Sequence, residues 1–181
     1  MMPVHFNASQ TNGCGTCNLC CRKYAGNRFV TRGEIRKIAA SGATDFFQKK
    51  PEFDFFVLKD KAGYCMFYDR KAGRCSIYTC RPADCRFFPY DLLRKGGKYF
   101  WIKWKIEKPA PGCLIYAGLD DEAEVSRLEK MVLPGFRGAL KAYTGYTDYM
   151  IAKSQHNFKI IREMRPGKKK RHPSGKANRK A

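Results

Sequence analysis

The stretch Cys14-Gly-Thr-Cys17-Asn-Leu-Cys20-Cys21 places four thiols within eight residues. Thiolates bind zinc and iron tightly, and two-residue spacers let a short loop wrap one ion without strain. At roughly 100° per residue on a helical turn, Cys14, Cys17 and Cys21 share a face while Cys20 points elsewhere. The run therefore predicts more than one metal centre, or one multinuclear cluster.

Composition and compartment favour metal-binding cysteines over a disulfide framework. The chain has 181 residues, 44% of them hydrophobic, which suits one folded domain with extensions. The opening MMPVHFNASQ has no cationic stretch followed by an apolar run, and no apolar segment approaches membrane-spanning length. We therefore expect a cytoplasmic protein without membrane contact, where cysteines stay reduced. The odd total of nine cysteines cannot all pair within one chain in any case.

Beyond the first cysteine run, the patterning predicts hairpins that carry further thiols. Aromatic and β-branched runs alternate with glycine-containing turns at 61–63 and 69–73, which is typical of hairpin strands. Cys65 and Cys75 lie on either side of the second turn, so a hairpin brings their thiols near one another, as in small metal knuckles. Residues 82–89, bounded by prolines, predict a helical turn that bears another cysteine.

Helices are expected on both sides of these hairpins. Residues 31–42 begin with a capping-box pattern, continue with apolar residues at helical spacing and end at a glycine. Residues 44–51 predict a further helical turn. In the C-terminal part, residues 120–131 open with clustered carboxylates, as expected at the positive end of a helix dipole. Two more helices are predicted over 136–143 and 148–164, separated by a glycine.

Two basic features raise the question of a nucleic-acid partner. The hairpin predicted over 90–106 alternates apolar residues with a face on which Trp101 lies among lysines. Such a face could stack nucleic-acid bases, but the favoured interpretation is a half-buried edge strand whose lysines discourage edge pairing. The tail 165–181 holds a large share of the net charge of +20 and predicts a disordered arm. This arm either binds nucleic acid or an acidic partner through its charge, or only aids solubility.

The spaced motifs together resemble a known family. They are the C-x2-C-x2-C-C run, a C-x9-C pair, the motif S-I-Y-x-x-R-P-x-x-C-R-x-F-P at 76–89 and a final isolated cysteine. Over about residues 13 to 115 the chain resembles the CxxCxxCC family of zinc- or iron-chelating domains, the YkgJ-type cysteine cluster proteins. The resemblance implies eight cysteine ligands, which fall on Cys14, Cys17, Cys20, Cys21, Cys65, Cys75, Cys85 and Cys113.

Three neighbouring residues complete the predicted site. Cys80 is the ninth cysteine, at a position where the family pattern requires none, and we expect it to be a small buried apolar residue and not a ligand. Arg81 and Arg86 match the R-P-x-x-C-R element, and their guanidinium groups could donate to coordinated sulfur and steady a negatively charged site. The alternative is that both arginines are solvated.

The sequence therefore predicts an α+β protein: a small cysteine-rich metal-binding core with short helices and hairpins, then a helical C-terminal extension and a disordered basic tail. The expected division is 1–116 for the cysteine-cluster domain, 117–164 for the helical extension packed on it, and 165–181 for the tail.

Metal identity and function stay open at this stage. Four cysteines suit zinc and iron–sulfur clusters alike, and the adjacent Cys20-Cys21 pair favours an iron–sulfur cluster because it distributes ligands awkwardly for mononuclear tetrahedra. Metal chelation is the leading function. One alternative is an iron–sulfur oxidoreductase or methyl-transfer enzyme, by analogy with the cysteine-cluster region of flagellin lysine N-methylase-like proteins. The other is a metal-stabilised module that binds RNA or a ribonucleoprotein.

Overall fold

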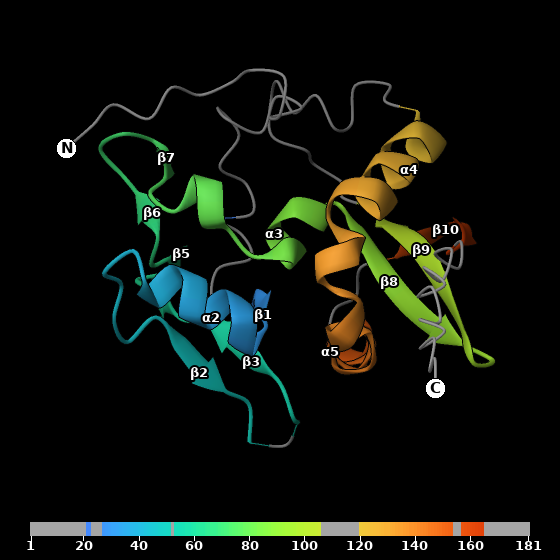
Figure 1. Ribbon diagram of the computed structural model, residues 1–181, viewed down its shortest axis with the longest axis horizontal. Coiled ribbons are helices and arrows are strands. Elements are labelled where there is room, and N and C mark those ends of the chain that lie inside the picture. The colour runs from blue at the N-terminus through green and yellow to red at the C-terminus, as the bar shows by residue number, and fades with distance from the viewer. Residues whose placement is uncertain (1–20, 23–26, 52, 106–119, 154–156, 165–181) are drawn as a thin grey trace, which may run out of the picture.

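The computed structural model describes residues 21–22, 27–51, 53–105, 120–153 and 157–164 (Figure 1). The fold is α+β, as predicted, with short helices and small antiparallel sheets. No helix in the described ranges is long and apolar enough to cross a membrane.

The first part of the fold is a three-stranded sheet with one helix. Its elements are β1 (Phe29–Val30), α2 (Arg32–Ala39), β2 (Phe47–Lys49) and β3 (Phe56–Leu58). The strands run antiparallel in the order β1-β3-β2. The helix forms where the capping box predicts it, because Glu34 N donates to Thr31 Oγ1 at 3.1 Å and Thr31 N donates to Glu34 Oε2 at 2.9 Å.

The helical turn expected over 44–51 is wrong, since this segment forms β2. Asp45 has a positive φ of 49°, which a helical turn does not allow. Phe47 instead pairs with Leu58 on β3 and packs edge-to-face on Phe56, with ring centroids 5.7 Å apart. Cross-strand aromatic packing of this kind outweighs a weak local capping signal.

The cysteine-bearing middle of the chain consists of two small hairpins followed by two short helical segments. These are β4 (Asp60–Lys61), β5 (Tyr64–Cys65), β6 (Tyr68–Asp69), β7 (Arg74–Cys75), η2 (Tyr78–Cys80) and α3 (Ala83–Phe87). The predicted hairpins and the helical turn between the prolines are thereby confirmed. Pro82 is the N-cap of α3, and a cis peptide bond joins Phe88 to Pro89 just after it.

The last part of the fold is a second three-stranded sheet with two helices. Its elements are β8 (Tyr90–Lys95), β9 (Lys98–Trp104), α4 (Asp121–Met131), η3 (Leu133–Gly135), η4 (Arg137–Ala139), α5 (Leu140–Lys153) and β10 (Phe158–Glu163). The strand order is β10-β9-β8, all antiparallel. The α4 helix begins as predicted, with Asp120 as its N-cap.

Two helix predictions in this part are wrong. The α5 helix runs straight through Gly145, although a helical glycine costs about 1 kcal/mol relative to alanine. Tyr143 and Tyr146 on either side are both buried, and that burial outweighs the cost. The helix predicted over 148–164 also ends early, at Lys153, and residues 158–163 add a strand to β9.

The addition of β10 changes the interpretation of Trp101. Strand β9 is central and not an edge, and Trp101 is 0% exposed. Its indole Nε1 donates to Glu129 Oε1 on α4 at 2.9 Å. The ring therefore presents no face to a nucleic-acid base, and both the edge-strand interpretation and the base-stacking alternative fail for this hairpin.

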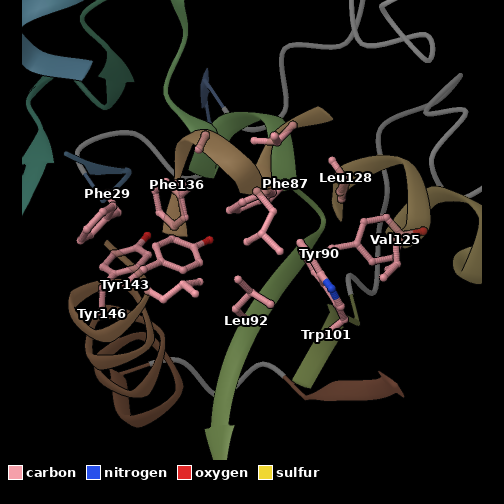
Figure 2. Close-up of a cluster of buried hydrophobic side chains, with 14 of the residues drawn as sticks. Phe29, Phe87, Tyr90, Leu92, Trp101, Val125, Leu128, Phe136, Tyr143 and Tyr146 are labelled. Carbon is pink, nitrogen blue, oxygen red and sulfur yellow. The ribbon is translucent and has the colours of Figure 1, made fainter. Parts of the chain in front are cut away.

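Two groups of buried apolar side chains hold the fold together. The large core (Figure 2) comprises Phe29, Phe55, Val57, Ala83, Phe87, Tyr90, Leu92, Trp101, Val125, Leu128, Val132, Leu133, Phe136, Leu140, Tyr143 and Tyr146. The small core comprises Val30, Ile38, Phe46, Leu58, Cys65, Phe67 and Ile77. The α3 helix contacts both β1 and β8 and lies between the hairpins and the second sheet (Figure 1).

We predict that Phe87→Ala lowers the free energy of unfolding by about 3–5 kcal/mol, as expected for truncating a fully buried aromatic side chain. Phe87 is at the centre of the large core, and its ring centroid lies 5.3 Å from those of both Trp101 and Phe136. Denaturant titration of the purified protein measures the change. Met131→Ala is the control, because Met131 is 58% exposed and should change stability by less than about 0.5 kcal/mol.

Candidate metal centre

Five of the nine cysteines lie in the described part of the chain. They are Cys21, Cys65, Cys75, Cys80 and Cys85. The other four predicted ligands, Cys14, Cys17, Cys20 and Cys113, lie outside the described residues. The geometry below therefore concerns four of the eight predicted ligands, together with Cys80.

Cys65 and Cys75 occupy equivalent positions in two copies of one local motif. Lys61-Ala-Gly-Tyr-Cys65 is followed, ten residues later, by Lys71-Ala-Gly-Arg-Cys75. In each copy the glycine has a positive φ, 76° at Gly63 and 65° at Gly73, and the cysteine ends the return strand. This short repeat is a signal in the sequence that our motif analysis missed. The turns themselves differ, because Cys65 pairs with Asp60 across a shorter loop and Cys75 pairs with Tyr68 across a longer one. Both hairpins nevertheless place the cysteine at the end of the return strand.

The repeat continues into the small core. Two residues after each cysteine comes a buried apolar side chain, Phe67 after Cys65 and Ile77 after Cys75. A backbone hydrogen bond joins the two segments next to these side chains, since Ser76 N donates to Phe67 O at 2.8 Å. Each hairpin is thus anchored by an apolar residue next to its thiol.

Four of the described cysteines gather at this small core. Cys65 is buried, 7% exposed, while Cys21, Cys75 and Cys80 are half-buried and pack against it. Burial raises the pKa of the Cys80 thiol, and the neighbouring Cys75 adds to this. Cys80 is half-buried and not fully buried as we expected. Because a bound metal deprotonates its thiol ligands, the role of Cys80 stays a prediction.

The donor chemistry fits a soft metal, but the described residues alone do not make a complete site. Within them, no three His, Cys, Asp or Glu side chains are placed to hold one ion. Sulfur donors in apolar surroundings suit zinc and iron, and exclusion of water strengthens the attraction between a thiolate and a cation.

Cys85 lies apart from this group, on α3. It is half-exposed, and of the five described cysteines it is the one that does not belong to the small core or pack on it. Arg86 follows it and is exposed, and its pKa is lowered by burial and influenced by the nearby groups Glu34, Arg81 and Cys85. Arg81 stacks on the Tyr78 ring, its guanidinium carbon 4.0 Å from the ring centroid. The roles of Arg81 and Arg86 beside a metal stay predictions.

Two carboxylates fix the position of α3, and our sequence analysis assigned neither to this task. Ala83 N donates to Glu34 Oε1 at 2.6 Å. Asp84 accepts from Phe29 N at 3.1 Å and from Tyr143 OH at 2.9 Å, and Arg28 Nη1 lies 3.6 Å from its Oδ2. The helix that carries Cys85 is therefore tied to three other parts of the fold.

A second buried carboxyl group, Asp91, lies near Asp84. It accepts from Leu92 N at 2.8 Å, from Thr147 Oγ1 at 2.9 Å and from Trp104 Nε1 at 3.1 Å. Burial raises its pKa to about 6, and the charge of Asp84 adds to the rise. Asp91 is thus a titrating group in a buried polar network that links β8 to β9 and α5.

We predict that Asp91 makes the protein less stable as the pH rises through about 6, because the folded state holds the Asp91 proton more tightly than the unfolded state, in which the pKa is 3.8. This contribution is present at low pH and lost above the folded-state pKa. The loss falls between the unfolded-state pKa of 3.8 and the folded-state pKa of about 6. The Asp91→Asn variant has no titratable side chain at this position, so the free energy of unfolding of this variant should fall less across that interval, as measured by denaturant titration. Asp54→Asn is the control, since the Asp54 side chain is 94% exposed. Equal pH profiles for Asp91→Asn and the wild type would contradict the prediction.

The hairpin-borne thiols around an apolar cluster define a class, the small cysteine-rich α+β protein with soft-metal donors. The sequence profile of the CxxCxxCC family, described as "Putative zinc- or iron-chelating domain", matches residues 13–114. The chain belongs to this family, which confirms the resemblance inferred from its motifs.

A curated relative agrees with this assignment. The "Uncharacterized protein MJ0661" of Methanocaldococcus jannaschii is 32% identical over 91 residues, which cover 47% of this chain and 48% of that protein. The chain therefore spans about half the length of this relative. No solved structure matches the chain.

Proposed function

We propose that the protein binds zinc or iron through eight cysteine thiolates, those of Cys14, Cys17, Cys20, Cys21, Cys65, Cys75, Cys85 and Cys113. The observation that carries the proposal is the convergence of Cys21 and of both repeat cysteines, Cys65 and Cys75, on the small core. Cys21 precedes Cys65 by 44 positions, so one bound ion or cluster would cross-link the N-terminal part of the chain to the two hairpins.

The energetics favour a role of the metal in folding. The small core has only seven buried members and is bordered by two-stranded hairpins, which are marginally stable in isolation. Structural zinc binding supplies on the order of 10–16 kcal/mol in small domains, comparable with the whole stability of an ordinary domain. We therefore expect the small core to loosen when the metal is removed, while the large core keeps its aromatic packing.

The metal determines what the site does beyond this cross-link. Zinc supplies a structural bond, whereas an iron–sulfur cluster supplies an electron-transfer centre as well. The adjacent Cys20-Cys21 pair favours the cluster, since the pair distributes its two sulfurs between metal ions more readily than onto one tetrahedron. Elemental analysis and a visible absorption spectrum of protein purified without oxygen distinguish the two. Iron with acid-labile sulfide and a broad brown absorbance identifies the iron–sulfur cluster. Stoichiometric zinc in a colourless sample identifies the structural zinc site.

We predict that Cys75→Ser lowers both the metal content and the melting temperature, because it removes one ligand from the small core. Cys80→Ser is the matched control, being a half-buried cysteine of the same cluster, and should keep the metal content of the wild type. Metal per chain and thermal unfolding are measured on the same samples. An unchanged metal content and melting temperature in Cys75→Ser would contradict the proposed ligand set.

A further inference from the structure

We infer that Glu34 is the positioning residue for the metal ligand Cys85, acting through the N-terminus of α3. The inference rests on the proposed function, since it concerns one ligand of that site. Our sequence analysis assigned Glu34 only to the cap of its own helix.

The Glu34 carboxylate serves two helices at once. Its Oε2 accepts from Thr31 N and from Thr31 Oγ1, both at 2.9 Å, which completes the cap of α2. Its Oε1 accepts from Ala83 N at 2.6 Å, across 49 positions in the sequence. One side chain thereby fixes the start of α3 relative to the start of α2.

The α3 helix needs this outside partner. It has only five residues, and its N-cap, Pro82, forms no side-chain capping hydrogen bond. The first amide of such a helix has no partner within the helix, and Glu34 supplies one. Cys85 follows two residues after Ala83, so the contact that orients this first turn also orients the thiol.

Charge supports the same assignment. Arg86 is near enough to Glu34 and Cys85 to interact electrostatically with both. The negative charge of Glu34 favours the charged form of Arg86, and so favours a cation near the sulfur that would bind the metal. A bound thiolate gains from a nearby cation that is already in place.

The test separates positioning from helix capping by comparing Glu34→Ala with Thr31→Ala. Both variants break the cap of α2, and removing such a cap costs about 1 kcal/mol, but Thr31→Ala leaves the Glu34 contact with Ala83 intact. The full chain is loaded with Zn²⁺ as the probe ion, and its release to an excess of a coloured chelator is timed. Losing an outer partner of a metal ligand weakens metal binding about 10- to 100-fold, so we expect Glu34→Ala to release Zn²⁺ faster by about that factor. Thr31→Ala should release it at the wild-type rate.

A double-mutant cycle shows whether the effect passes through Cys85. Cys85→Ser should itself speed the release, and adding Glu34→Ala to it should have no further effect. Equal rates for Glu34→Ala and Thr31→Ala, or a full additional effect of Glu34→Ala on top of Cys85→Ser, would overturn the inference. If Glu34→Ala does not fold, Glu34→Leu, which keeps most of the side-chain volume but accepts no hydrogen bond, is judged by the same comparison with Thr31→Ala.

The same measurements distinguish failure of this inference from failure of the proposed function. If the wild-type protein retains neither zinc nor iron, the proposed function itself is wrong. If the wild-type protein holds the metal and Cys85→Ser releases it at the wild-type rate, Cys85 is not a ligand. The positioning role of Glu34 is then ruled out as well.

Discussion

The hydrogen bonds of the buried Asp84 carboxylate are the interaction on which the rest of the structure depends. A buried carboxylate is tolerated only when its oxygens are satisfied, and Asp84 finds its partners in Phe29 N on β1, Tyr143 OH on α5 and the guanidinium of Arg28. These partners lie far apart in the sequence and belong to both halves of the fold. Asp84 therefore ties α3 to the large core, while the contact of Glu34 with Ala83 N fixes the first turn of α3 against α2.

The two cores are stabilised in different ways. The large core buries sixteen apolar side chains, including an edge-to-face group of Phe87, Phe136 and Tyr143, and such burial needs no metal. The small core buries seven and is bordered by strands of two or three residues. Under the proposed function, a metal bound by its thiols would stabilise this half more than it would stabilise the large core. Four of the five cysteines in the described part of the chain lie at the core with fewer buried apolar side chains, where such a cross-link would matter most.

The sequence predicted the features that local chemistry decides. The capping box at Thr31, the glycine turns of the hairpins and the acidic start of α4 all lie where the patterns placed them. Long-range pairing decides the features that were wrong: β10 forms because β9 offers it an edge, and Trp101 is buried because β10 and α4 cover its strand. In the candidate site, cysteine spacing pointed to the thiols, but the contact of Glu34 with Ala83 spans 49 residues and no local pattern encodes it.

The repeated hairpins also contact each other through aromatic side chains at the border of the small core. Tyr64 of the first hairpin stacks on Tyr68 of the second, with ring centroids 5.7 Å apart and an interplanar angle of 10°, and Arg70 lies over the Tyr64 ring at 4.9 Å. Cation–π and stacking contacts of this kind contribute about 0.5–1 kcal/mol each at exposed positions. They cannot replace a metal cross-link, but they orient the hairpins that carry Cys65 and Cys75 before any ion arrives. Preorganisation lowers the entropy that metal binding must overcome, so the aromatic stack would favour the proposed binding of metal by the thiols of the same two hairpins.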